Sequence, residues 1–424
     1  MRCSTRSPSD SSAHRVHGDA GTAMMTVMAT TSILFVLATT LLTMVAYQTQ
    51  TALLRTARVR ATHVADAGIN AYLFELKTQY GYYLNAPDTG WITIGSGERY
   101  RVTATPAANG KPLTLHSTGA AGDGTVTIAA TVRFPSFADY MFLSDDILRV
   151  GSGALINGRV RCNADIINAG HITGKVVSGG RVTNTGTMDQ GFTEHQTTVD
   201  FNKVLADMDA IMLSSKGNNS YFPMSGAYGY RVTVNGQNVV VDKITGGTTT
   251  GVLVTTPVRS LNVPASGAIY FSDSVWVSGA YSVPLTVVSD RDIYVPNNYV
   301  PSDASSTVTG GLIAHGNIIV PCWYASVPQD MSLTAAMLSQ SGTISADMKQ
   351  GVFRDHITIT GSETYVQNGG FVTVNSYDQA TAGFRSRTYT YDQRLDDYPP
   401  PKYPVIQDGT LKVDTWIEDK TTGF

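Results

Sequence analysis

The first hydrophobic pattern in the chain is a long apolar stretch near the N-terminus. No charged residue and no histidine occurs between Ala20 and Leu54, and Met24 to Tyr47 supply most of the apolar side chains. At about 1.5 Å per residue, a helix of this length covers a bilayer core of about 30 Å. A cleaved secretory signal has a shorter apolar core, of about 7 to 15 residues. The stretch therefore predicts a membrane-spanning helix.

The helical pattern continues beyond this stretch without proline or a turn cluster, so we expect one helix over 22–78. In its second half, small and apolar residues recur along one face at alternating steps of four and three positions. An acidic residue lies beside this face. Small residues let a second helix approach closely, whereas an apolar face also docks on a sheet of the same chain. Packing against sister subunits and self-docking are therefore both retained. The helix-packing residues are Ala57, Ala61, Val64, Asp66, Gly68 and Ala71.

Charges on either side of the apolar stretch predict its orientation. Three arginines outnumber two aspartates before the stretch, and three more arginines just after it reduce the asymmetry. Positive charge favours the cytoplasmic side of a membrane. The prediction is a single-pass cell membrane protein with a cytoplasmic leader over 1–21 and an extracytoplasmic C-terminal domain.

Strict alternation of apolar and polar residues follows the helix over 88–136. It is clearest in Trp91 to Ile94, Tyr100 to Thr103 and Leu113 to Leu115, and short turns rich in Gly and Asn separate the runs. Period two with one apolar face predicts an antiparallel meander that packs on the amphipathic part of the helix.

Short β-type runs that repeat dominate 140–380. Ile156 to Val160 returns sixteen residues later as Ile172 to Val176, and a second family of runs bends through a Ser-Asp turn at Phe142 to Ile147, Tyr270 to Val275 and Val287 to Ile293. Such repeats stack and share one core, since a single coil cannot bury its apolar face. We interpret this part as an irregular, β-helix-like solenoid. A β-sandwich, which also has short strands and frequent turns, is the alternative.

The segment 196–260 interrupts the repeats. Apolar residues at steps of three and four predict an amphipathic helix from Asp200 to Leu213, and alternating runs around Asn235-Gly236 predict a hairpin. We interpret the segment as an inserted helix and β element. The fold class is therefore mainly β, with a long N-terminal helix, a small antiparallel sheet and an interrupted solenoid.

The last part of the chain, 381–424, contains three consecutive prolines, Pro399 to Pro401, and then Trp416. Prolines cannot donate to a sheet and impose an extended course, and a tryptophan ring can anchor such a segment. We expect a C-terminal strap that Trp416 holds on the solenoid as a cap for its last coil.

Composition and charge limit the classes of binding partner that the chain can have. The 424 residues include only 15% charged ones and give a net charge of -3, so no basic field is available for a nucleic acid. Of the three cysteines, Cys3 precedes the apolar stretch, which leaves Cys162 and Cys322 as a candidate disulfide pair. A bridge formed in an oxidising compartment and two buried thiols both remain open.

No motif indicates a metal, a cofactor or a nucleotide. The eight histidines have no pair at metal-ligand spacing, and Gly246 to Gly251 lacks the lysine of a phosphate-binding loop. An alternative to a structural role is a membrane-anchored β-helix enzyme or adhesin acting on polysaccharide, in which adjacent coils present paired carboxylates. Acidic residues at turns more simply bind nearby backbone N–H groups, so we expect no catalysis. The candidate carboxylates are Asp145, Asp146, Asp290, Asp292 and Asp355.

The N-terminal region resembles that of PilX-type minor pilins and related pilus assembly proteins of the type IV pilin-like class. The similarity rests on a leader ending in glycine, an uncharged span, a basic patch and then the run Val64 to Ala71. The tail from Pro399 to Trp416 is similar to the end of related pilus-associated proteins. The resemblance implies processing by a prepilin peptidase after a glycine, Gly21 or, as the alternative, Gly18. Thr26 stands where major pilins carry a glutamate, which narrows the resemblance to the minor branch.

This resemblance implies a structural or assembly component of a type IV pilus-like or type II secretion-like envelope filament. Its expected partners are the membrane, other pilin-like subunits and the pilus assembly machinery, and the β-rich domain is a candidate binder of a glycan or surface ligand.

Overall fold

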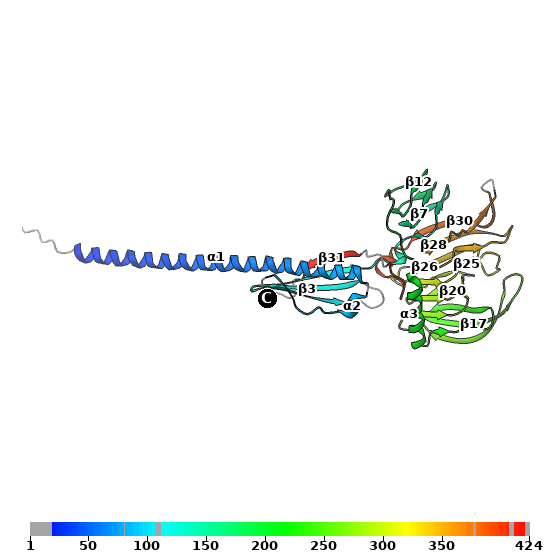
Figure 1. The fold of residues 1–424 in the computed structure, drawn as a ribbon, viewed down its shortest axis with the longest axis horizontal. Coiled ribbons are helices and arrows are strands. Elements are labelled where there is room, and N and C mark those ends of the chain that lie inside the picture. Colours follow the sequence, from blue (N-terminus) through cyan, green and yellow to red (C-terminus); the bar gives the residue numbers. More distant parts are fainter. Residues whose placement is uncertain are drawn as a thin grey trace, which may run out of the picture.

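Helix α1 (Asp19–Thr78) is the longest element, and its first half extends away from the sheets (Figure 1). The computed structural model describes residues 19–79, 81–95, 97–106, 112–375, 379–406 and 411–419. The continuous helix follows from the absence of proline and turn residues over sixty positions. The short helix α2 (Tyr82–Asn85) comes directly after it.

The second half of α1 packs on a small antiparallel sheet. Its strand order is β1-β2-β3-β4-β31, and the first four strands form the meander expected from the alternating pattern. On β3 every second residue is buried, because one face meets the helix. The strands are β1 (Ile92–Ile94), β2 (Glu98–Thr105), β3 (Leu113–Ala121), β4 (Gly124–Arg133) and β31 (Lys412–Glu418).

The fifth strand corrects the prediction for the C-terminal tail. β31 pairs with β4, with Trp416 opposite Ala130, so Trp416 lies in the N-terminal sheet and does not anchor a cap on the solenoid. The strap itself does lie on the solenoid further upstream, where Thr309 donates to the carbonyl of Tyr398 at 2.7 Å. The strap therefore connects the two domains. An isolated exposed strand is unstable alone, and β4 offers it a free edge.

Beyond the sheet, a first stack of parallel coils runs from a short 3-10 helix, η2 (Phe137–Asp139), to β14. Ile156 pairs with Ile172 and Ile172 with Met188, which is the sixteen-residue period predicted from the repeats. Two sides of these coils belong to the main sheet: β5 (Phe142–Ser144), β7 (Leu155–Asn157), β8 (Val160–Cys162), β10 (His171–Ile172), β11 (Val176–Ser178), β13 (Thr187–Met188) and β14 (Phe192–Thr193). The third side is a separate sheet of β6 (Leu148–Val150), β9 (Ile166–Asn168) and β12 (Val182–Asn184).

A second, larger stack contains the remaining strands. Tyr270 and Val288, from two of the Ser-Asp runs, lie in one column of neighbouring coils together with Ile313. Its first strands are β15 (Tyr221–Phe222), β16 (Gly229–Gly236), β17 (Asn238–Gly247), β18 (Leu253–Asn262), β19 (Ala268–Phe271), β20 (Val275–Tyr281), β21 (Leu285–Ser289) and β22 (Ile293–Tyr294). They are followed by β23 (Tyr299–Pro301), β24 (Gly310–Ala314), β25 (Ile318–Pro321), β26 (Asp330–Ser339), β27 (Ile344–Asp347), β28 (Phe353–Tyr365), β29 (Val372–Val374), β30 (Ala380–Tyr391) and the short helix α4 (Arg394–Asp397).

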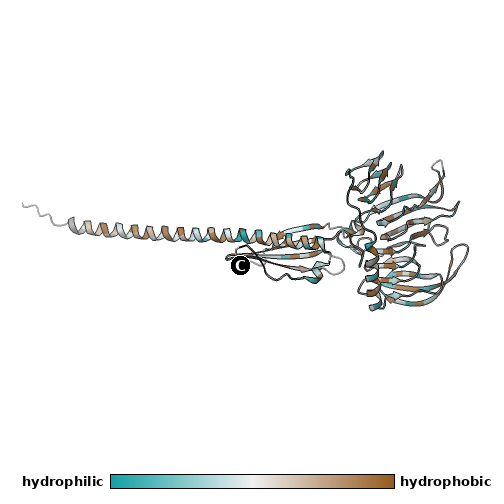
Figure 2. Ribbon diagram, in the orientation of Figure 1, coloured by the Kyte–Doolittle hydropathy of each residue, from teal (hydrophilic) through white to brown (hydrophobic). Residues whose placement is uncertain are grey.

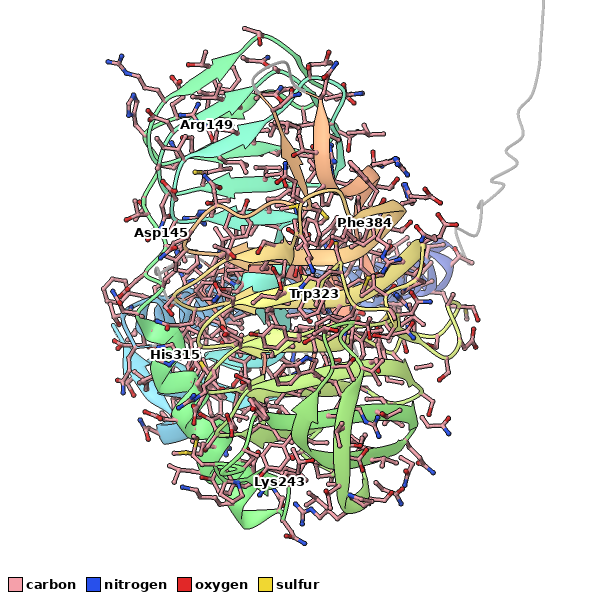
Figure 3. The ribbon with its side chains drawn as sticks, turned by 90° about the vertical axis from the view of Figure 1, so that its right-hand side faces the viewer. Asp145, Arg149, Lys243, His315, Trp323 and Phe384 are labelled. Atoms are coloured by element: carbon pink, nitrogen blue, oxygen red, sulfur yellow. The ribbon has the colours of Figure 1, made fainter. Side chains whose placement is uncertain are left out.

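The two stacks join in the middle of the solenoid. The end of β28 pairs with β5, and β30 pairs with β7, so the last coils of the chain meet the first ones. Helix α3 (Lys203–Gly217) packs on β15 and β19 of the larger stack. The chain thus winds outward through the small stack, crosses along α3 and winds back through the large one (Figures 1 and 3).

The mainly β fold class is confirmed, and parallel pairing between coils excludes the sandwich alternative. Two predicted boundaries need correction. The segment 196–260 is not a detached insertion, because β15 and β16 pair in parallel with β19 and β20 as the end coil of the large stack. The solenoid also extends past residue 380, since β30 is one of its central strands. Pairings between strands so distant in sequence leave no local pattern.

Candidate functional site

The first half of α1 is apolar and uncovered. One helix, Thr22–Thr78, is long and apolar enough to cross a membrane, and none of its most apolar window is buried (Figure 2). Threonine hydroxyls in this part bond back to carbonyls one turn earlier, as Thr30 does to Thr26 at 2.8 Å and Thr31 to Val27 at 2.8 Å. Such bonds satisfy the hydroxyls without breaking the helix. This half is a candidate membrane span.

The second half of α1 uses its small-residue face on the chain's own sheet. Ala61, Val64 and Gly68 are buried there, and Ala57 is half-buried. Ala71 is exposed, so it takes no part in docking on the chain's own sheet. The face is completed by larger residues that the small-residue pattern did not include: Ile69, Tyr72, Leu73 and Leu76.

Close approach of backbone to backbone explains why small residues occur on this face. A Cβ atom at Gly119 of β3 would lie 2.2 Å from the carbonyl oxygen of Ala61, and one at Gly124 would lie 2.6 Å from the carbonyl carbon of Ala57. A Cβ on Gly68 would meet Oγ of Ser117 at 2.5 Å. Helix and sheet therefore dock through glycine and alanine on both surfaces.

Asp66, the acidic residue between two alanines, binds the C-terminal strand. Its Oδ1 accepts a hydrogen bond from Nε1 of Trp416 at 2.9 Å, and Arg58 on the same helix forms an ion pair of 2.6 Å with Glu418. Both partners lie on β31. Sequence reasoning found Asp66 and Trp416 separately, but nothing in the sequence indicated that they meet.

Replacing Trp416 by phenylalanine tests this contact. An aromatic ring is kept, although a smaller one, and the N–H donor is lost, so we expect the sheet to lose about 1 kcal/mol of stability. Hydrogen exchange of β31 and β4 amides in the detergent-solubilised chain measures the effect. Ile417→Val, at an exposed neighbour on the same strand, serves as the control. Equal protection in both variants would show that the indole bond contributes nothing.

A group of ion pairs joins the small sheet to the solenoid. Arg133 of β4 contacts Asp397 of α4 at 3.5 Å, and its pair with Asp414 of β31 at 2.9 Å holds it in place within the sheet. Lys412 also pairs with Asp139 of η2. Burial raises the pKa of the Asp139 carboxyl, and the nearby Lys412 opposes that rise. These contacts connect the two domains at the point where both the chain and its returning strap cross between them.

The remaining predicted positions are dispersed. Residues 1–18, with Cys3, lie outside the described part of the chain, and Gly21 falls in the first turn of α1. Cys162 and Cys322 are both buried free thiols, so no disulfide joins them. Burial raises the pKa of Cys162 to about 11 and that of Cys322 to about 12. Neither is a reactive thiolate at neutral pH.

The candidate carboxylates are engaged in local bonds. Asp145 and Asp290 belong to one turn column but are four coil steps apart, about 19 Å at about 4.8 Å per step, which exceeds the 5 to 10 Å of a glycosidase acid pair. Figure 3 shows Asp145 and His315, from the same column, at separate heights on the stack. The donors are Asn163 for Asp145, Ile147 for Asp146, Tyr270 for Asp290, Asn317 for Asp292 and Arg385 for Asp355.

Comparison with known proteins gives distant structural neighbours. No family model and no curated sequence matches the chain. The competence-associated pilin ComZ from Thermus thermophilus is 12% identical and covers 86% of this chain and 98% of its own, with a TM-score of 0.33. An ice-binding protein from the Antarctic ascomycete Antarctomyces psychrotrophicus is 10% identical and covers 61% of this chain and 96% of its own, with a TM-score of 0.27. At these values neither similarity assigns an activity.

Proposed function

We propose that the chain is a structural or assembly component of a type IV pilus-like or type II secretion-like envelope filament. The observation that carries the proposal is the division of α1 into two halves. The first is apolar and uncovered, and the second is docked on an antiparallel sheet that presents a large β-solenoid at its far end (Figure 1). A helix that is apolar all round needs a membrane or other helices around it.

The proposed partners follow from these surfaces. The uncovered half of α1 lies in the membrane, with the N-terminus in the cytoplasm, or among the helices of other pilin-like subunits in a filament. The small-residue face of the second half is occupied by the chain's own sheet. Contacts with sister subunits therefore involve the opposite, exposed face, which carries Val59, Ala71 and Phe74. The role is non-catalytic, and the solenoid is displayed for packing or adhesion to a surface glycan.

Fractionation with N-terminal sequencing tests the proposal. We expect the chain in the membrane fraction and, if it is a filament subunit of the PilX type, a mature start at Thr22 in sheared surface material. An intact Met1 confined to the membrane would support a stationary assembly factor. Recovery of the whole chain in the soluble fraction would contradict both roles.

Charges placed in the apolar half should release the chain. Leu37 and Leu41 are exposed there, and an arginine near the centre of a bilayer costs about 2.5 to 3.5 kcal/mol. The double variant Leu37→Arg and Leu41→Arg is expected to lose most of its membrane association. Ala71→Arg, at an exposed position of the docked half, is the matched control and should remain with the membrane. Equal partitioning of the two variants would argue against a membrane span.

A further inference from the structure

Each coil of the solenoid has three sides. Strand pairing continues from one stack to the other on two of these sides but not on the third. On the third side, β6 pairs with β9 in its own sheet and β27 pairs with β25 of the large stack. Within the described part of the chain, no pairing joins β6 to β27. A partly open cavity of about 400 Å³ lies at this gap and is lined from both stacks. Its size is in the range of small-molecule sites.

Polar residues point inward at this junction, where the columns of the solenoid are otherwise apolar. Glu363 of β28 occupies an inward position in such a column, and seven register-equivalent residues are all apolar. They are Ile269, Val287, Leu312, Met337, Phe142, Val160 and Val176. A carboxyl group in place of an apolar side chain in a continuous core lowers the stability of the fold, so stability does not explain its presence there.

Two residues of β30 break their columns in the same way. In one column the stacked residues are Met331, Ile357 and then Arg387. In another column Tyr389 is stacked between Ile359 and Ile156. Glu363, Arg387 and Tyr389 all line the cavity. The three columns therefore change from apolar to polar in adjoining layers, at the gap.

Glu363 and Arg387 do not pair with each other in the cavity. Glu363 is 2% exposed, and its Oε1 has no hydrogen-bond partner among the described residues. Arg387 donates from Nη1 to the carbonyl oxygen of Phe384 at 3.1 Å, and within the described chain no ion pair shorter than 4.0 Å joins it to Glu363. Burial raises the pKa of the Tyr389 hydroxyl, Glu363 adds to that rise and Arg387 opposes it, so both residues act on the same hydroxyl. A buried acceptor and a separate guanidinium face the same space.

The walls between these charges are aromatic. The ring of Phe142 lies 5.2 Å from that of Tyr389 and 6.4 Å from that of Tyr365, both in edge-to-face arrangements. Phe371 also lines the cavity, and the exposed Arg149 of β6 adds a second positive charge at its mouth. Aromatic rings pack well against an apolar group, and the face of a ring attracts an ammonium group.

We propose that this cavity binds a small zwitterion of the amino-acid class, whose ammonium group donates to Glu363 and whose carboxylate accepts from Arg387. An apolar side chain of the ligand packs on Phe142, Tyr365 and Tyr389. The ammonium group supplies the donor that Oε1 of Glu363 lacks, and the Glu363 carboxyl releases its own proton to solvent on binding. The ligand's carboxylate gives the Arg387 guanidinium a charged acceptor in addition to the carbonyl of Phe384. Each such charge-assisted bond is stronger than a neutral one. The inference does not depend on the filament role, because it rests on the solenoid alone.

Titration calorimetry of the detergent-solubilised full chain tests the proposal with four probes of similar size: L-phenylalanine, phenethylamine, 3-phenylpropionate and glucose. We expect L-phenylalanine to bind most tightly, each singly charged probe to bind at least about tenfold more weakly, and glucose not to bind. Strongest binding of glucose or of 3-phenylpropionate would overturn the zwitterion assignment. Absence of binding by L-phenylalanine at concentrations on the order of 10 mM would overturn the site.

Three variants locate the binding. Glu363→Gln is expected to weaken the binding of L-phenylalanine and of phenethylamine at least about tenfold and to leave the affinity for 3-phenylpropionate unchanged. Arg387→Gln is expected to weaken L-phenylalanine and 3-phenylpropionate but not phenethylamine. Asp355→Asn, an exposed carboxylate on the same strand as Glu363, is the control and should leave all affinities unchanged. Retention of full L-phenylalanine affinity by both cavity variants would place the binding elsewhere and refute the proposal. A near-UV circular dichroism spectrum checks that each variant is folded.

Discussion

Gly119→Val is expected to separate helix α1 from its sheet. A Cβ atom at this position would lie 2.2 Å from the carbonyl oxygen of Ala61 and 2.4 Å from the backbone nitrogen of Ala65. Both atoms belong to the helix backbone, so no side-chain rotation relieves the clash. Overpacking of a close contact costs about 1 to 3 kcal/mol, and more where backbone must move. We expect a loss of at least about 3 kcal/mol in this sheet, seen as faster hydrogen exchange over residues 61–76.

Ala120→Val on the same strand is the matched control. Residue 120 points to the opposite, half-buried face of β3, where valine suits a strand. The control should therefore keep the exchange pattern of the parent chain. Detachment of the helix would also remove the hydrogen bond between Trp416 and Asp66, so tryptophan fluorescence is a second measurement. Normal protection of α1 in Gly119→Val would mean that the docking is looser than these distances indicate.

This docking has a consequence for the proposed filament. Gly68→Leu would disturb the chain's own sheet, because a Cβ there already meets Ser117 and Tyr100. Loss of assembly in such a variant would therefore not identify a subunit contact. Substitutions at exposed Ala71 or Phe74 test that contact without disturbing the sheet.

Much of the fold could be predicted because its signals are local. The absence of charges defined the first half of α1, and the sixteen-residue spacing between Ile156 and Ile172 defined the coils, since in-register parallel stacking repeats the same side-chain pattern. Ala71 lies off the face that docks on the sheet for a physical reason. Residues spaced by alternating steps of four and three positions drift around a straight helix by about 20° per heptad. Ala71 comes two heptads after Ala57, so its side chain has rotated away from the sheet. Tyr72 and Leu76 fill that face instead.

The contacts that could not be predicted are those between distant segments. Asp66 and Trp416 are 350 positions apart, and the pairing of Glu363 with Phe142 closes the solenoid across more than half of the chain. In the sequence Glu363 is one polar residue in a run of polar residues. Its inward position is visible only once the register places it below Met337, because a strand residue has no fixed face until its partners are known.

Because this register buries the Glu363 side chain, the stability of the solenoid should depend on pH. Burial raises the pKa of the Glu363 carboxyl from 4.5 to about 8. Between these values the unfolded chain releases the proton and the folded chain keeps it, so stability is highest below about pH 4.5 and falls as the pH rises towards 8. At about 1.4 kcal/mol per pH unit over this window, the loss amounts to roughly 5 kcal/mol at most.

Glu363→Gln should remove this pH dependence. The amide has the same size and no proton to release, so the variant is expected to match the parent chain near pH 5 and to exceed it in melting temperature at pH 8 to 9. Thermal unfolding of the solubilised full chain, followed through the near-UV signal of the stacked Trp276 and Tyr294 rings, measures the solenoid directly. Glu75→Gln, at an exposed position of α1, is the control and should follow the parent curve. If Glu363→Gln also follows the parent curve, Glu363 is ionised in the folded chain and a neighbouring positive group must compensate it.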